Sequence, residues 1–167
     1  MRTIPYLLLG ILFTLLHSNA LALQNKVVIG RVENVRIYPG NLILHAKVDT
    51  GSKNSSLGCD TIQTFEQNGE KWVRFSVTTK KGKTITIERK VHRMAKIKRH
   101  FGKITKRIVI NLGVCLGNVY KETEVNLTNR SGFNYYMLIG RSFMEDDFIV
   151  DPSLKYTTKP TCKEAAN

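Results

Sequence analysis

Short stretches of alternating polar and apolar residues, separated by turn residues, constrain the fold of this chain most strongly. Between Trp72 and Thr79, positions 73, 75 and 77 are Val, Phe and Val. Positions 72, 74, 76 and 78 are Trp, Arg, Ser and Thr. The run Lys80-Lys81-Gly82-Lys83 predicts a turn, and residues 84–91 alternate again. A period of two is typical of half-buried β-strands. The sequence therefore predicts an all-β fold.

The rest of the chain fits the same prediction. Val- and Ile-rich or alternating runs predict further strands at residues 27–37, 42–48, 104–112, 119–127 and 137–139. Tyr38-Pro39-Gly40-Asn41 predicts a turn between the first two. The one helix we predict is short, at residues 141–146, because no long stretch repeats with a period of 3.6 residues. Short strands at this spacing, in a chain of 167 residues, indicate one small sandwich or barrel.

The first 22 residues read as a secretory signal. Arg2 precedes an apolar run of about 13 residues, which is short of the roughly 20 needed to span a bilayer. Ala20-Leu21-Ala22 fits the small-x-small cleavage rule. We expect export across the inner membrane to the periplasm and a mature domain at residues 23–167; an uncleaved N-terminal anchor is the alternative.

Three cysteines remain in the mature chain, at Cys59, Cys115 and Cys162. In an oxidising compartment they allow one disulfide, in any of three pairings, and one free thiol. Three buried thiols are the alternative. No pair has the Cys-x-x-Cys spacing of a redox or zinc site.

Basic residues are concentrated in one segment. The formal net charge is +13, and residues 80–107 hold twelve Lys and Arg but one acid, Glu88. Such a segment attracts polyanions, including acidic peptides and acidic membrane surfaces. We do not expect nucleic acid, because only Phe101 is available there for base stacking. The alternative is a solvated hairpin without a specific partner.

The segment with the clearest chemistry is Ala46-Lys47-Val48-Asp49-Thr50-Gly51, which is followed by Ser52. An apolar strand leads directly into an Asp, and Gly51 permits the tight turn that presents its carboxylate. Two carboxylates brought together share one proton, so one acts as general base on a water and the other as general acid. The motif suits one half of an aspartic protease site. The alternative is an Asx-turn aspartate without chemistry.

A second motif follows at Leu138-Ile139-Gly140-Arg141. With both motifs in this order, the chain resembles the bacterial retropepsin-like aspartic endopeptidases related to RimB, formerly labelled ATP-dependent zinc proteases. The resemblance rests on these stretches: 29–31 with Glu33, 46–52, 55–57, 107–110, 127–131, 137–141 and 150–152. It implies a small closed barrel with one short helix, Asp49 as the catalytic residue with Thr50, Gly51 and Ser52 supporting its loop, and residues 138–141 packed behind that loop.

The resemblance also implies a homodimer, because one chain supplies a single Asp-Thr-Gly. The substrate, a peptide or protein in which acidic residues are expected, would lie under flaps, for which residues 84–100 are our candidate. Two positions depart from the pattern. Gly58-Cys59 stands where the family usually has His-Ala, and Lys53 stands where retroviral enzymes have an acid that pairs with the Arg of the second motif.

We expect neither a metal nor another cofactor. The sequence has no His-Glu-x-x-His and no phosphate-binding Gly-rich loop ending in Gly-Lys-Ser/Thr. Two other classes of function remain open. One is a catalytically silent module on the same fold that holds acidic peptides or envelope polyanions. The other is an accessory envelope protein in which Asp49 only forms a turn.

Overall fold

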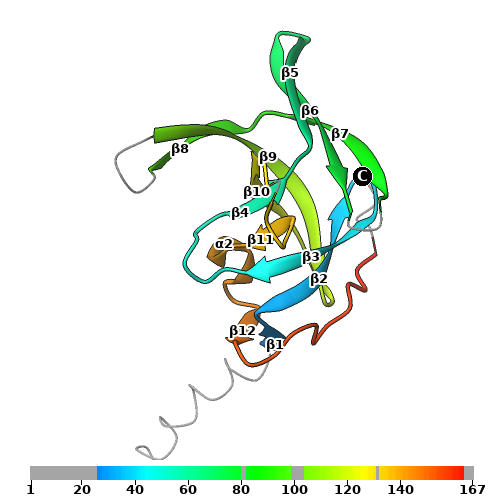
Figure 1. The fold of residues 1–167 in the computed structure, drawn as a ribbon, viewed down its shortest axis with the longest axis vertical. Coiled ribbons are helices and arrows are strands. Elements are labelled where there is room, and N and C mark those ends of the chain that lie inside the picture. Colours follow the sequence, from blue (N-terminus) through cyan, green and yellow to red (C-terminus); the bar gives the residue numbers. More distant parts are fainter. Residues whose placement is uncertain (1–25, 80–81, 99–103, 131, 164–167) are drawn as a thin grey trace, which may run out of the picture.

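The computed structural model describes residues 26–79, 82–98, 104–130 and 132–163 (Figure 1). The predicted signal at residues 1–22 and Phe101 lie outside the described residues. Within these ranges no helix is long and apolar enough to cross a membrane. The chain is almost wholly β-structure, as the alternation predicts.

Six strands close into a barrel. In order around it they are β10 (Val119–Thr128), β4 (Ser55–Gly58), β11 (Met137–Ile139), β3 (Leu42–Val48), β2 (Val32–Tyr38) and β9 (Ile104–Leu116). Pairing between β9 and β10 completes the ring. A further strand, β8 (Arg93–Lys98), pairs with the first half of β9 and so extends beyond the ring. The predicted closed barrel with one short helix is confirmed.

The hairpin of β2 and β3 shows how the pattern produces the barrel wall. Along β3 the residues at 42, 44, 46 and 48 are buried, and those between them are exposed. The turn uses Gly40 and Asn41 with positive φ values of 100° and 52°, which Gly and Asn adopt most readily. The predicted run at residues 27–37 is divided, because the chain breaks at Arg31 between β1 (Val27–Gly30) and β2.

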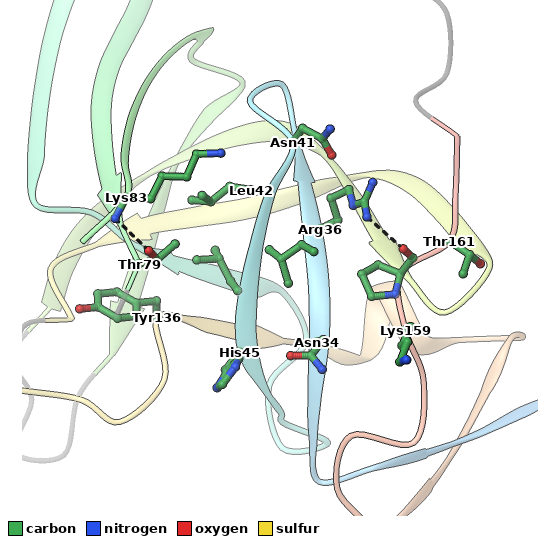
Figure 2. Close-up of a pocket in the computed structure, with 13 residues that line it drawn as sticks. Asn34, Arg36, Asn41, Leu42, His45, Thr79, Lys83, Tyr136, Lys159 and Thr161 are labelled. Carbon is green, nitrogen blue, oxygen red and sulfur yellow. Dashed lines mark hydrogen bonds between the residues drawn. The ribbon is translucent and has the colours of Figure 1, made fainter. Parts of the chain in front are cut away.

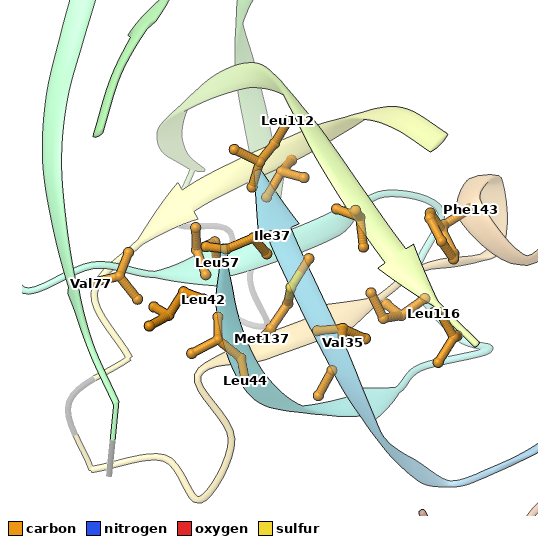
Figure 3. Packing of buried hydrophobic residues seen from close by; sticks show 14 of the residues in the cluster. Val35, Ile37, Leu42, Leu44, Leu57, Val77, Leu112, Leu116, Met137 and Phe143 are labelled. Carbon is orange, nitrogen blue, oxygen red and sulfur yellow. The ribbon is translucent and has the colours of Figure 1, made fainter. Parts of the chain in front are cut away.

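Apolar side chains from every side of the ring fill the barrel (Figure 3). Ile37 and Leu44 come from the β2–β3 hairpin, Leu112 from β9 and Met137 from β11, and all are at most 2% exposed. The core continues outside the ring to Phe143 of the helix. Burial of such side chains contributes roughly 1.5–3 kcal/mol each.

A separate three-stranded sheet stands at the top of Figure 1. It consists of β5 (Thr61–Gln67), β6 (Glu70–Thr78) and β7 (Thr84–Lys90). Our flap candidate at residues 84–100 is therefore wrong as a single hairpin: β7 belongs to this sheet, whereas β8 pairs with β9. The last two residues of that range lie outside the described residues.

The opposite end of the molecule is closed by β1, which pairs in parallel with β12 (Phe148–Asp151), and by the short helix α2 (Arg141–Met144). The chain then runs back along β2 to Cys162, which forms a disulfide with Cys115 of β9. Cys59 is free and buried. The disulfide is therefore Cys115–Cys162, which is one of the three pairings that the sequence left open.

Candidate active site

Asp49 follows the last residue of β3 and is held there by β11. The two strands are parallel, and Ile139 is the partner of Val48. The backbone N–H of Asp49 donates to the carbonyl oxygen of Ile139 at 2.9 Å. The end of β3 and the motif at residues 138–141 are therefore joined directly, as the resemblance implies.

The loop itself orients the carboxylate of Asp49. The backbone N–H of Gly51 donates to Oδ1 at 3.1 Å, and the hydroxyl of Ser52 donates to Oδ2 at 2.8 Å. Asp49 is partly buried, and Thr50 and Gly51 are exposed. This arrangement leaves the carboxylate accessible while its two oxygens have fixed positions. An Asx-type bond to Gly51 is present, but the second bond from Ser52 goes beyond a simple turn.

The second motif packs against the back of this loop. The N–H of Arg141 donates to the carbonyl oxygen of Ser52 at 2.9 Å, and Ser142 donates to that of Lys53 through both its N–H and its hydroxyl. A Cβ atom on Gly140 would lie 2.5 Å from the carbonyl carbon of Asn54. Only glycine allows this approach of the two backbones. The other two motif residues lie in β11, where Ile139 is buried in the core and Leu138 is half-buried.

Arg141 finds its partner in the loop backbone. Its Nη1 donates to the carbonyl oxygen of Thr50 at 2.9 Å. The bond fixes the part of the loop that directly follows Asp49. Arg141 therefore has a hydrogen-bond partner in the loop, although Lys53 stands at the position where retroviral enzymes have an acid that pairs with this arginine.

Asn54, at the end of the loop, and Ser55, the first residue of β4, have roles that the sequence did not predict. The hydroxyl of Ser55 accepts a bond from the N–H of Gly140 at 3.1 Å, so it fixes the corner between β11 and α2. The side-chain amide of Asn54 donates to the carboxylate of Glu124 on β10 at 3.1 Å. No sequence signal connects Asn54 with Glu124, because their contact depends on how the barrel closes.

Glu124 joins the loop of Asp49 to the hairpin of β8 and β9. Arg93, at the start of β8, donates to both oxygens of this carboxylate, and His92 lies 3.2 Å from one of them. The bond from Arg93 is the main cause that lowers the pKa of Glu124. In Figure 1 the hairpin extends on the same side of the barrel as the loop between β3 and β4.

The departure at Gly58-Cys59 has a structural explanation. A Cβ atom on Gly58 would lie 2.8 Å from the Cβ of Arg130, so the stem of Arg130 occupies the space that a larger residue needs. Cys59 is buried, and burial raises the pKa of its thiol to about 12. Cys59 is therefore a core residue and not a nucleophile.

The described residues also contain a pocket of about 820 Å³ on another part of the surface (Figure 2). Arg36, Ile43, His45, Tyr136 and Lys159 are among the residues that line it. None of the predicted site residues lines this pocket. Within the described ranges, no group of three or more His, Cys, Asp or Glu could hold a metal ion.

A family model described as the RimB retropepsin-like aspartic endopeptidase matches residues 28–161. This chain belongs to the RimB-like family. The matched range includes Asp49 and the motif at residues 138–141, and it ends one residue before Cys162. The RimB-like fold and the resemblance seen in the sequence are thereby confirmed.

Curated relatives carry a different name. A probable alpha-L-glutamate ligase of Shewanella halifaxensis is 37% identical over 135 residues, which is 78% of this chain and 29% of that protein. One from Desulfotalea psychrophila is 34% identical over 125 residues, 73% of this chain and 27% of that protein. The chain thus spans less than a third of the length of these relatives.

A solved structure gives the same fold. The crystal structure of a Legionella pneumophila protein of unknown function has a TM-score of 0.69 and 38% sequence identity. The similarity covers 80% of this chain and 98% of that one.

Proposed function

We propose that this protein is an exported aspartic endopeptidase whose active site combines Asp49 from two subunits. The observation that carries the proposal is the loop of Asp49, in which Gly51 and Ser52 orient the carboxylate and Ile139 anchors the backbone. Membership of a family described as retropepsin-like aspartic endopeptidases supports it.

The chemistry requires one ionised and one protonated carboxylate, a state that two adjacent carboxylates favour because they share a proton. The ionised Asp49 takes a proton from a water, whose oxygen adds to the scissile carbonyl carbon. The other Asp49 gives its proton to the carbonyl oxygen. The tetrahedral intermediate then collapses, the C–N bond breaks, and the Asp49 that took the proton from water gives it to the leaving nitrogen.

A second subunit is needed because the sequence holds one Asp-Thr-Gly. The other acids that the sequence offers lack a following Thr/Ser-Gly; they are Asp60, Asp146, Asp147 and Asp151 among others. A two-fold axis next to Asp49 would bring it against its own symmetry mate. The exposed position of Thr50 and Gly51 is consistent with such a contact.

We propose peptides that contain acidic residues as substrates. The segment at residues 80–107 carries a large excess of basic residues, which attracts acidic peptides and, as a further partner of that segment, acidic membrane surfaces. Relatives of this chain are named as probable glutamate ligases. A domain that handles glutamate-containing peptides fits that association; the ligase activity itself is a property named for those longer proteins.

The Cys115–Cys162 disulfide supports the proposal of an exported protein. Disulfides persist in oxidising compartments such as the bacterial periplasm and are rare in the reducing cytosol.

A catalytically silent module that holds acidic peptides is the competing proposal, because the exposed loop and the basic segment suit binding as well as hydrolysis. The test is cleavage of a complex peptide mixture between about pH 4 and 7 by the mature protein and by Asp49→Asn. Asp60→Asn, which removes an exposed carboxylate outside the loop, is the matched control.

Cleavage by the wild type and by Asp60→Asn, but not by Asp49→Asn, is the result we expect. Equal cleavage by Asp49→Asn would contradict the proposal. If none of the three cleaves at concentrations where the protein is dimeric, the silent module is the better account.

A further inference from the structure

The pocket of about 820 Å³ is lined by the β2–β3 hairpin and by segments on either side of it. Arg36 and Ile43 are opposite each other in the register of the hairpin, and both line the pocket. Figure 2 shows Thr79, Lys83 and Tyr136 on one side of β3 and Lys159 and Thr161 on the other. The volume lies within the range of about 300–1,000 Å³ that is typical of small-molecule sites. The pocket is therefore large enough for a ligand of its own.

One wall of the pocket is held in place by covalent and hydrogen bonds. The Nη2 of Arg36 donates to the carbonyl oxygen of Pro160 at 3.3 Å. Thr161 follows, and the next residue, Cys162, is fixed by its disulfide. The hydroxyl of Tyr38 donates to the carbonyl oxygen of Cys162 at 3.1 Å. Because this wall is already formed, a ligand would not have to order it on binding.

The charged side chains that line the pocket are all basic. They are Arg36, Lys83 and Lys159, and no Asp or Glu is among the lining residues. Within the described residues, none of these three side chains forms an ion pair. The guanidinium of Arg36 is half-buried, and in the same part of the chain its Nε has no acceptor. An anion in the pocket would offset this excess of positive charge.

Apolar side chains lie among these basic groups. Ile43 is 47% exposed although it stands in the middle of β3. Tyr136 is half-buried and Pro160 is buried, and both line the pocket with Ile43. Contact with a ligand would remove the apolar surface of Ile43 from water. The combination suits a ligand that has an apolar body as well as a negative group.

We propose that this pocket binds a small amphiphilic carboxylate, such as a fatty acid of medium chain length. The carboxylate would lie on Arg36, whose planar guanidinium matches the two oxygens of a carboxylate. Lys83 and Lys159 would add positive charge from the two sides of β3, and the hydrocarbon chain would cover Ile43. The site is separate from the loop of Asp49, so the proposal holds whether or not the protein is a peptidase.

The test is isothermal titration calorimetry of the mature protein with octanoate, below the concentration at which octanoate forms micelles. We expect saturable binding at one site. Octylamine has the same chain and the opposite charge, and it should bind at least tenfold more weakly. Butanoate should also bind at least tenfold more weakly, because each buried CH₂ group strengthens binding by about two- to fourfold.

Variants then place the ligand in this pocket. Arg36→Gln should weaken octanoate binding by about tenfold or more, as for other hydrogen bonds to a charged group. Lys159→Gln should weaken it by about two- to fivefold, because the side chain is exposed. Ile43→Thr keeps the β-branched shape and should reduce the difference between octanoate and butanoate. Lys155→Gln, in the same C-terminal segment but outside the pocket, should bind octanoate as the wild type does.

Several results would overturn the proposal. They are the absence of saturable octanoate binding, equal affinity for octanoate and octylamine, and equal affinity for octanoate and butanoate. Tighter binding of octyl phosphate than of octanoate would overturn the assignment of a carboxylate. Unchanged affinity in both Arg36→Gln and Lys159→Gln would place octanoate elsewhere on the protein. If circular dichroism shows that Arg36→Gln is unfolded, the double variant Lys83→Gln/Lys159→Gln takes its place.

Discussion

Gly140 and Asn54 are in direct backbone contact: a Cβ atom on Gly140 would lie 2.5 Å from the Asn54 carbonyl carbon. This contact lets the corner between β11 and α2 support the loop that carries Asp49. The Asp-Thr-Gly and Ile-Gly-Arg motifs are thus two sides of one packed unit.

Gly140→Ala should therefore disturb the site as well as the fold. The new methyl group must displace backbone and not a flexible side chain, so we expect a loss of about 2–4 kcal/mol in the free energy of unfolding. Urea denaturation measures this loss, and peptide cleavage should fall with it.

Gly69→Ala is a suitable control for that experiment. Gly69 has a φ of 74°, but an added Cβ atom would meet nothing within 4 Å. Its replacement should cost only the left-handed backbone strain, roughly 1–2 kcal/mol. Equal losses for the two variants would show that close packing at Gly140 is unimportant.

Glu33 should stabilise the protein in a pH-dependent manner. Its buried carboxylate accepts bonds from the N–H of Gly30 and from the N–H and hydroxyl groups of Thr157 and Thr158. Burial raises the pKa of Glu33, but these bonds together lower it below the ordinary value of 4.5. The stabilisation is therefore complete above that value and is lost as the pH falls through the lower pKa of the folded state.

Glu33→Gln places an amide NH₂ among donors, so we expect a loss of about 2–4 kcal/mol near pH 7. Unfolding measured between pH 3 and 7 (about the range in which a carboxyl titrates) should show the difference from wild type shrinking towards acid. Glu66→Gln, on the exposed strand β5, serves as the control. A difference that stays constant with pH would contradict this account.

The cysteines should differ sharply in reactivity. Since burial raises the pKa of Cys59 to about 12, its thiol should remain protonated at about pH 8 and react slowly with iodoacetamide in the folded protein. Mass spectrometry should detect one disulfide, between Cys115 and Cys162, and alkylation of Cys59 only after unfolding. Rapid labelling of Cys59 in the native protein would be inconsistent with the structure.

Glu124 should affect activity more than stability. Its bonds to Asn54 and Arg93 connect the Asp49 loop with the β8–β9 hairpin, but the ion pair is partly exposed and contributes at most about 1 kcal/mol. We expect Glu124→Gln to lower kcat/KM by about tenfold through misplacement of the loop. Glu88→Gln, which breaks the exposed pair with Arg74, should leave kcat/KM unchanged. Similar effects of both variants would argue against the connection.

The sequence predicted the parts of the fold that have local signals. Strands β3 and β11 have the predicted bounds, because apolar residues alternate or cluster there and a turn or glycine follows. Strands β4, β5, β8 and β12 were not predicted. Of these, β5 had an overlooked signal in Asn68-Gly69, which forms the hairpin turn with positive φ at both residues.

Other features depend on closure of the barrel and had no local signal. Strand β4 consists of Ser, Leu and Gly residues that are buried only because β10 and β11 flank it. In the same way, the contact of Asn54 with Glu124 and that of Arg130 with Ser56 join distant segments. The motif residues of the site were predicted, whereas the residues around them were not.

The most direct test of the central claim is activity in mixed dimers of wild-type and Asp49→Asn subunits, formed by co-refolding. If each active site needs two Asp49 carboxylates, only wild-type homodimers cleave. Equal amounts of the two subunits should then leave about one quarter of the activity of an all-wild-type sample at the same total protein concentration. A value near one half, expected if each subunit has an independent site, or near three quarters, expected if one Asp49 per dimer suffices, would contradict the shared site.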